Sequence, residues 1–217
     1  MLKECLEIIF FYMRHKRYAV SKMKTFIPPL DNTSLAEMQV TYELYFNSLF
    51  AILDFVNSDL KQNQIITHFK KTVGGDDNYL YVRELRNSII HRGLDVSAAG
   101  IVIKDLNIVA PFSPQFVFDR NKNKKYYAFT TNLLNLVKIT EGINEELLNI
   151  CNELNIITYV PMTKEIYDER IKNDPYIPEY AKKMSLSLNL DYEHINKNLK
   201  SIHEERILKY FNTADLI

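Results

Sequence analysis

The residues best suited to chemistry in this sequence are Arg86, Asn87 and His91. An imidazole titrates near neutral pH and can act as a general base, whereas a guanidinium stays charged and offers forked donors to phosphate oxygens. An asparagine one helical turn before a histidine can orient the ring or donate to a non-bridging oxygen. RNA carries its own nucleophile, the 2′-hydroxyl group, so a base and a cation suffice to cleave it without a metal ion.

These three residues fall on a helix that the sequence predicts from Asp76 to Gly93. Asp76 or Asp77 can accept a hydrogen bond from the first turn, and Gly93 can take the left-handed conformation that ends a helix. Apolar positions at helical spacing form one buried stripe on this segment. Five residues correspond to about 140° of rotation and about 7.5 Å of rise, so Arg86 and His91 should flank a groove without touching each other.

The segment from Glu84 to Gly93 resembles the signature of the HEPN superfamily, which are small all-helical domains of bacterial toxins, phage-defence proteins and RNA-processing ribonucleases. That signature is an arginine, often followed by a polar residue, and a histidine four to six positions further on. Arg86, Asn87 and His91 match it. Related toxins carry a tyrosine two residues after the histidine, where this chain has Gly93.

The resemblance implies a metal-independent endoribonuclease that acts as a homodimer, with two copies of the motif facing each other across the twofold axis. It implies an RNA substrate, no cofactor and no metal ion, and it leaves room for an antitoxin or regulatory protein. The expected products are a 2′,3′-cyclic phosphate and a 5′-hydroxyl end. Arg86, Asn87 and His91 are the candidate catalytic residues. The candidate RNA-binding residues are Arg83, Arg92, Lys122, Lys124 and Lys125.

Two other functions fit the same residues. One is a non-catalytic module of the same fold that dimerises or binds RNA or a nucleotide. The other is a sensor whose polar rim binds the phosphate of a small molecule without cleaving it. A structural role is also possible for each residue alone, because an arginine on a helix shoulder is commonly salt-bridged and a histidine at a helix end is commonly a cap.

Composition limits the compartment and the kind of partner. The 217 residues include 27 Lys and Arg and 27 Asp and Glu, so the net charge is zero and RNA must be held by local clusters of cations. Two cysteines are too few for a disulfide framework or a zinc site, which favours a reducing cytoplasm. The apolar run from Leu6 to Met13 is too short to span a bilayer, and Glu7 interrupts it. We therefore expect a cytoplasmic protein, and the resemblance implies one of the toxin or antiviral-defence kind.

The rest of the sequence predicts a mainly all-α fold, an antiparallel helical bundle, and the resemblance implies that this bundle is of the HEPN type. A first helix is expected from Leu2 to about Thr25. A second should begin at a cap on Thr33 or Ser34, with Glu37 completing a capping box. Two more are expected, one from Ile65 to Val73 and one from Thr131 to Ile157 with a bend at Gly142. A small β-hairpin insertion is expected at about residues 100–129. We expect residues 1–160 to form the bundle with this insertion, and residues 161–217 to form a helical extension packed on the bundle or on a partner.

Two basic segments allow more than one interpretation. The hairpin turn Asp119–Lys125 is basic and its flanks are aromatic, which suits contact with single-stranded RNA, but the aromatic side chains of such a hairpin can also turn inward. The run that includes Arg14, Lys16 and Arg17 on the first helix could guide RNA or could form a solvated face.

Overall fold

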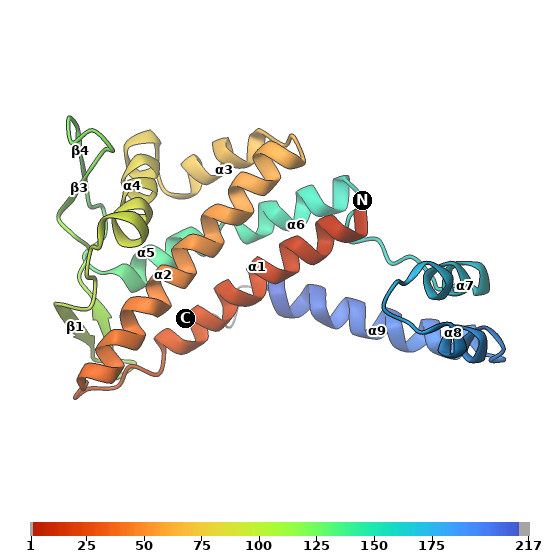
Figure 1. Cartoon of the computed structure of the whole chain (residues 1–217). Coiled ribbons are helices and arrows are strands. Elements are labelled where there is room, and N and C mark those ends of the chain that lie inside the picture. The colour runs from red at the N-terminus through yellow and green to blue at the C-terminus, as the bar shows by residue number, and fades with distance from the viewer. Residues whose placement is uncertain (1, 213–217) are drawn as a thin grey trace. The chain divides into compact units, whose positions relative to one another are not determined.

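The computed structural model describes residues 2–212, which are mainly helical with two small antiparallel sheets (Figure 1). The chain divides into two compact units. The second unit is Ile157–Lys209, and the first contains the other described residues, 2–156 and 210–212. The predicted mainly helical class is confirmed, but the β insertion consists of two hairpins instead of one.

Helices α1 (Leu2–Met23) and α2 (Asn32–Asp54) run antiparallel and pack against each other (Figure 1). Both carry apolar side chains at intervals of three and four residues, which places them on one face of each helix. Buried side chains on the two helices include Ile9, Met13, Val20, Tyr42, Phe46, Leu49 and Leu53. Each such side chain contributes about 1.5–3 kcal/mol when fully buried, so this pair forms much of the core.

Both ends of α2 differ from the simplest helix geometry. Its N-cap is Asp31, whose carboxylate accepts a hydrogen bond from the backbone N–H of Ser34 at 2.7 Å. The predicted capping box is therefore wrong, because Asp31 takes the cap position and the carboxylate of Glu37 pairs with Lys22 Nζ at 2.8 Å. At the other end α2 widens into a short π-helix, η1 (Phe55–Asp59).

Helix α4 (Asp76–Arg92) carries the candidate residues and follows the short helix α3 (Gln64–Thr72). It packs against α2, α3 and the second hairpin. Its buried residues lie mostly three or four positions apart, which places them on one side of the helix. They are Tyr81, Val82, Glu84, Leu85, Ser88 and Ile89. The predicted apolar stripe is thus present, and the polar residues Glu84 and Ser88 are buried beside it.

The ends of α4 are only partly as predicted. Gly93 takes the left-handed conformation, with φ 68° and ψ 30°, and ends the helix as expected. The N-cap is Gly75, so the prediction that Asp76 or Asp77 caps the helix is wrong. Both carboxylates lie in the first turn, where the helix dipole favours negative charge, and Asp76 pairs with Lys70 Nζ at 2.7 Å.

The β segments form two antiparallel hairpins, one of β1 (Gly100–Ile103) with β2 (Ile108–Pro111) and one of β3 (Phe116–Phe118) with β4 (Lys125–Tyr127). The β3–β4 hairpin packs on α4. Asp119 closes its turn, because its carboxylate accepts hydrogen bonds from the backbone N–H groups of residues 123 and 124, at 2.6 and 3.1 Å. These bonds fix the conformation of the basic turn.

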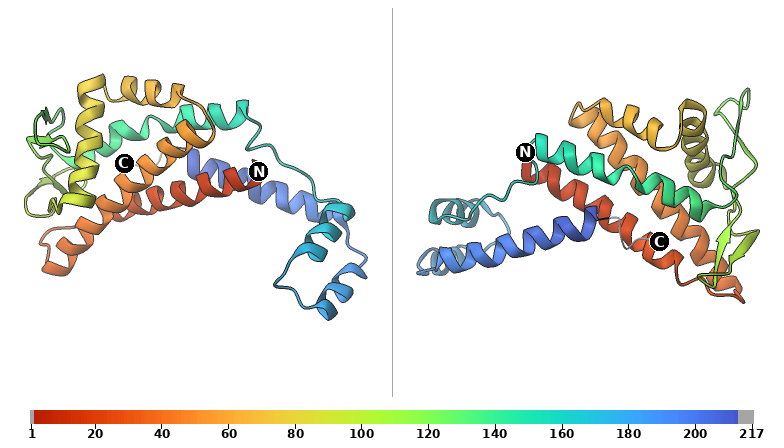
Figure 2. Two further views of the ribbon diagram at one scale, coloured as in Figure 1. Left: turned by 45° about the horizontal axis from the view of Figure 1, so that its top comes forward. Right: turned by 180° about the vertical axis from the view of Figure 1, so that it is seen from behind.

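The single helix expected from Thr131 to Ile157 is broken at Gly142 into α5 (Leu133–Glu141) and α6 (Asn144–Glu153). Both lie alongside α1, as the two views in Figure 2 show. Asn132 caps α5 by accepting a hydrogen bond from the backbone N–H of Asn135 at 2.9 Å.

A polar cluster lies inside the core where α1, α2, α5 and α6 meet. Lys16 is fully buried, and its Nζ contacts Asn144 Oδ1 and lies 3.1 Å from Glu141 Oε1. Tyr45 Oη donates to Glu141 Oε1 at 2.7 Å and lies 2.8 Å from Thr140 Oγ1. Neither interpretation of the basic run on the first helix holds for Lys16, because this side chain points into the core.

The second unit contains α7 (Lys164–Asn173), α8 (Glu179–Leu186) and most of α9 (Tyr192–Phe211). Its residues from 158 to 209 are all exposed or half-buried, so this unit has no core of its own. Polar contacts join its segments; Asn196, for example, bonds to Tyr159 Oη and to the backbone of Met162.

Among the helices of residues 2–212, none combines the length and the apolar character needed to cross a bilayer.

Candidate functional site

His91 and Asn87 open onto the same cavity at the end of α4. The cavity has a volume of about 440 Å³ and is lined by Glu84, Asn87, His91, Arg92 and Arg120. Four of these residues come from α4, and Arg120 comes from the turn of the β3–β4 hairpin. His91 is exposed and Asn87 is half-buried. An imidazole, an amide and two guanidinium groups are therefore presented to one small volume.

Glu84 is a buried carboxylate that lines this cavity and binds its neighbours. It is only 4% exposed, and its carboxylate accepts a hydrogen bond from Arg92 Nη2 at 2.9 Å. Two longer contacts, both 3.4 Å, join its Oε1 to Arg83 Nε and Asn87 Nδ2. A buried carboxylate is costly unless it is paired and hydrogen-bonded, and these donors provide the pairing.

Arg92 joins α4 to the β3–β4 hairpin. Its Nη1 donates to the backbone carbonyl oxygens of Phe118 and Asp119, at 2.7 and 3.2 Å. Its Nη2 donates to the backbone oxygen of Glu84 at 3.0 Å as well as to the Glu84 carboxylate. The guanidinium lines the cavity, but protein acceptors already engage both of its terminal nitrogens.

Arg86 lies on the side of α4 that faces α2 and is not among the residues that line the cavity. Its Nη1 donates to Asn87 Oδ1 at 3.0 Å, and its Nη2 donates to Asn47 Oδ1 at 3.2 Å. Its Nε is buried without a hydrogen-bond partner in the described part of the chain. Burial raises the pKa of Asp54, and the nearby Arg86 charge acts in the opposite direction. Arg86 thus contacts Asn87, which lines the same cavity as His91.

The other predicted RNA-binding residues are spread over α4 and the hairpin. Arg83 is half-buried beside Glu84, with its guanidinium 5.9 Å from the Tyr79 ring centroid. Lys124 Nζ lies 3.8 Å from Asp77 Oδ1, Lys125 Nζ lies over two phenylalanine rings, and Lys122 is exposed in the turn. None of these four side chains lines the cavity, whereas Arg92 does.

Sequence reasoning missed two cavity residues, Glu84 and Arg120. Glu84 had a detectable signal, because it precedes Asn87 by three residues and His91 by seven, which places all three on one line along a helix. For Arg120, the only signal in the sequence was its position in a basic turn. No helical period connects that turn to α4, so only the tertiary fold brings it to the cavity.

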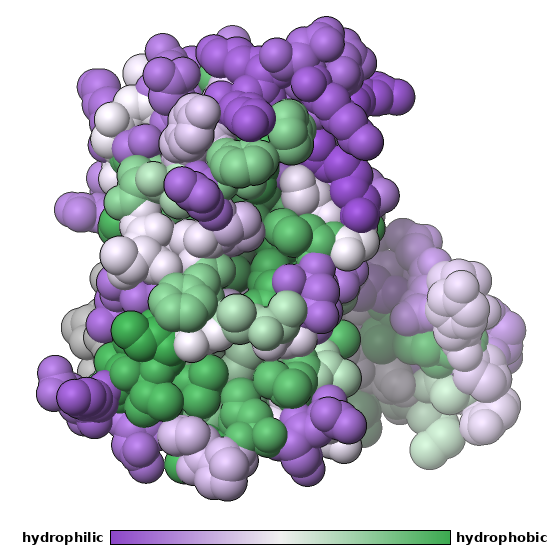
Figure 3. All heavy atoms as spheres, turned by 90° about the vertical axis from the view of Figure 1, so that its left-hand side faces the viewer, coloured by the Kyte–Doolittle hydropathy of each residue, from purple (hydrophilic) through white to green (hydrophobic). Residues whose placement is uncertain are grey.

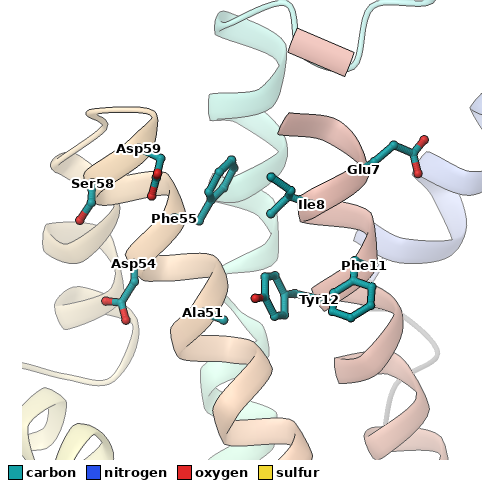
Figure 4. A pocket seen from close by; sticks show the side chains of 9 residues that line it. All are labelled: Glu7, Ile8, Phe11, Tyr12, Ala51, Asp54, Phe55, Ser58 and Asp59. Carbon is teal, nitrogen blue, oxygen red and sulfur yellow. The ribbon is translucent and has the colours of Figure 1, made fainter. Parts of the chain in front are cut away.

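A second cavity, of about 690 Å³, lies between α1 and the end of α2 with η1. The side chains of Ile8, Tyr12 and Phe55 point into the gap between the helices, whereas those of Glu7 and Asp54 point away from it (Figure 4). None of the residues predicted for the site lines this cavity. It is a mainly apolar groove, and the site described above is separate from it.

Across residues 2–212, no three His, Cys, Asp or Glu side chains are grouped in a way that could hold a metal ion. Comparison with known proteins found no family model, no curated protein and no solved structure that matches this chain.

Proposed function

We propose that this protein is a metal-independent endoribonuclease of the toxin or phage-defence kind, with a helical bundle of the HEPN type, which acts as a homodimer. The observation that carries the proposal is the shared cavity, in which His91 and Asn87 meet the guanidinium groups of Arg92 and Arg120. A base and cations beside one opening are the groups that cleavage by a 2′-hydroxyl requires.

In the proposed reaction, His91 accepts the proton of the 2′-hydroxyl as the 2′-oxygen attacks the adjacent phosphorus. The bond from phosphorus to the 5′-oxygen breaks, and the second copy of His91, in its protonated form, gives a proton to that oxygen. One proton thus moves from the 2′-oxygen to the 5′-oxygen, and the products are a 2′,3′-cyclic phosphate and a 5′-hydroxyl end. Arg120 and Asn87 stabilise the charge that develops on the non-bridging oxygens.

The contacts of Arg86 support a positioning role within this proposal. Arg86 holds the oxygen of Asn87, and Glu84 holds its nitrogen, so both ends of the amide are fixed. A fixed amide one turn before His91 can orient the imidazole or the scissile phosphate. Arg86 therefore acts through Asn87 and contributes its positive charge from beside the cavity.

Replacement of the proposed base tests the function. We expect His91→Ala to lower cleavage of an unstructured RNA by roughly 10²- to 10⁴-fold, the usual contribution of general acid–base catalysis. Gel analysis of cleavage and of the 2′,3′-cyclic phosphate end measures this directly, with and without EDTA, which should change little. His194→Ala is the matched control, because His194 is exposed on α9 and its ring contacts the side chain of Asn198 at 3.1 Å. Undiminished cleavage by His91→Ala would end the proposal.

The arrangement of Arg86 and Arg92 favours one alternative, a non-catalytic module that dimerises or binds RNA or a nucleotide. Protein acceptors hold both terminal nitrogens of each arginine, as expected for residues that build a rim. If this alternative holds, the purified protein gives no cyclic phosphate, and a bound nucleotide raises its melting temperature, because a ligand of the native state stabilises it.

A further inference from the structure

The β3–β4 hairpin has one face turned toward α4 and one turned away from it. In its register Phe116 pairs with Tyr127, Val117 with Tyr126, and Phe118 with Lys125. Side chains alternate between the two faces of a strand, so Val117 and Tyr126 share the inner face, and both are buried. The outer face therefore consists of Phe116, Phe118, Lys125 and Tyr127.

This outer face combines aromatic rings with a held cation. Lys125 Nζ lies 4.4 Å from the Phe116 ring centroid and 5.5 Å from that of Phe118. The Phe116 and Tyr127 ring centroids are 6.3 Å apart with an interplanar angle of 63°, so the two rings meet edge to face. Tyr127 is 62% exposed. Aromatic side chains on an outward-facing hairpin have no core to fill, which indicates a binding role.

The neighbouring turn adds positive charge. Arg120, Lys122 and Lys124 are all exposed there. Figure 3 looks onto the side where the strands lie, and hydrophilic side chains gather at its top, where Figure 1 places the β3–β4 turn. Because the net charge of the chain is zero, an anionic polymer must be attracted by a local cluster of positive charge, such as this turn.

We propose that this outer face is a stacking platform for single-stranded RNA, in which an unpaired base stacks on the ring of Tyr127 and Lys125 bonds the adjacent phosphate. The proposal rests on the ribonuclease function and names the form of its substrate. Stacking requires a base whose flat face is free, and the bases of a duplex are covered by their neighbours, so the platform selects unpaired RNA.

The platform and the candidate active site share the β3–β4 hairpin. The same hairpin supplies Arg120 to the cavity and accepts hydrogen bonds from Arg92 through its backbone oxygens. RNA bound on the platform would thus be held by the same hairpin that borders the cavity.

The test measures RNA affinity separately from cleavage. Fluorescence anisotropy with a short, labelled, unstructured oligoribonucleotide is recorded on the full chain with His91→Ala, so that the RNA stays intact. We expect Tyr127→Ala to weaken binding roughly 5- to 100-fold, the effect of losing one stacked base. Tyr127→Phe keeps the ring and should bind as before. Tyr18→Ala is the matched control, because Tyr18 is 60% exposed and lies on α1. The same RNA paired with its complement should bind more weakly.

Each other result overturns the platform. If Tyr127→Ala binds like Tyr18→Ala, the platform is wrong, and cleavage by the wild-type chain then decides the proposed function separately. If the chain binds no single-stranded RNA but still cleaves it, only the platform falls; if it does neither, both proposals fall. If Tyr127→Ala changes the sedimentation of the protein and leaves RNA affinity unchanged, the face is a protein interface.

Discussion

At the scale of single residues, Glu84 is the centre of the candidate site. It is buried, and its carboxylate holds Arg92, Arg83 and Asn87 around one side of the cavity. Arg86 then fixes the other end of the Asn87 amide. Asn87 is thus constrained at both its oxygen and its nitrogen, which is the kind of support that a catalytic amide needs to stay in place.

The buried cluster around Lys16 is a second polar network, within the core. Burial lowers the pKa of Lys16, and the charge of Glu141 opposes this. Burial also raises the pKa of Tyr45 well above its ordinary value, and the Glu141 charge adds to this rise. The hydrogen bonds and the ion pair of this cluster join α1, α2, α5 and α6 at one point.

We expect Tyr45→Phe to lower the free energy of unfolding by about 1.5–3 kcal/mol near neutral pH, because it removes a hydrogen bond to a buried carboxylate. The difference should shrink above about pH 10. There the unfolded wild-type chain releases the Tyr45 proton that the folded chain keeps, so wild-type stability falls by up to about 1.4 kcal/mol per pH unit through this group, and the variant has no such group.

Urea unfolding followed by circular dichroism, near pH 7 and near pH 11, measures both parts of this prediction. Tyr176→Phe is the control, because Tyr176 is 92% exposed and its hydroxyl group faces solvent. A difference between wild type and Tyr45→Phe that grows with rising pH would contradict the assigned direction of the Tyr45 pKa.

At the scale of elements, the β3–β4 hairpin depends on Arg92. This one side chain ties the backbone of Phe118 and Asp119 to α4, while Val117 and Tyr126 supply the apolar contact. A two-stranded hairpin is marginally stable on its own, so its position over the cavity is set by these contacts.

We expect Arg92→Ala to loosen the hairpin and to destabilise the chain by about 1.5–3 kcal/mol, because Glu84 loses its shortest hydrogen bond to a cation. Hydrogen–deuterium exchange should rise across residues 116–127. Arg120→Ala is the matched control, since it removes a guanidinium from the same hairpin without touching this anchor. Arg120→Ala should lower cleavage roughly 10- to 100-fold, as for loss of a hydrogen bond to a charged phosphate, with unchanged exchange. Equal exchange in both variants would show that Arg92 is not the anchor.

The elements themselves were largely predictable, because hydrophobic period and glycine punctuation are local signals. Gly93 ends α4 as expected, and the strands lie within the expected β insertion at about residues 100–129. The caps were less predictable. Asp31 competes with Thr33 and Ser34 for the start of α2, and only the structure shows that Glu37 is drawn to Lys22 instead. Local sequence offers several caps, and tertiary partners decide among them.

At the scale of the whole molecule, the site depends on contacts between elements far apart in the sequence. The helix period separates Arg86 from His91, but the expected groove between them is not seen, because Arg86 does not line the cavity of His91. The period also could not show that Asn47 of α2 holds Arg86 or that Arg120 lines the same cavity as His91. The inward or outward direction of the hairpin aromatics was also open from sequence, and it follows from packing on α4. Long-range packing thus decides which of several basic residues reach the cavity.

The proposed dimer gives the last prediction. If each cleavage requires one His91 as base and the other as acid, a heterodimer of wild-type and His91→Ala subunits is inactive. At constant total protein, with subunits allowed to exchange, activity should then fall as the square of the wild-type fraction. Independent sites would give a linear fall. Sedimentation should show a species of twice the 25.5 kDa chain mass. His194→Ala subunits, mixed in the same way, should leave activity constant. A linear fall, or a protein that stays monomeric, would exclude a composite site, because the second imidazole would then not take part in the reaction.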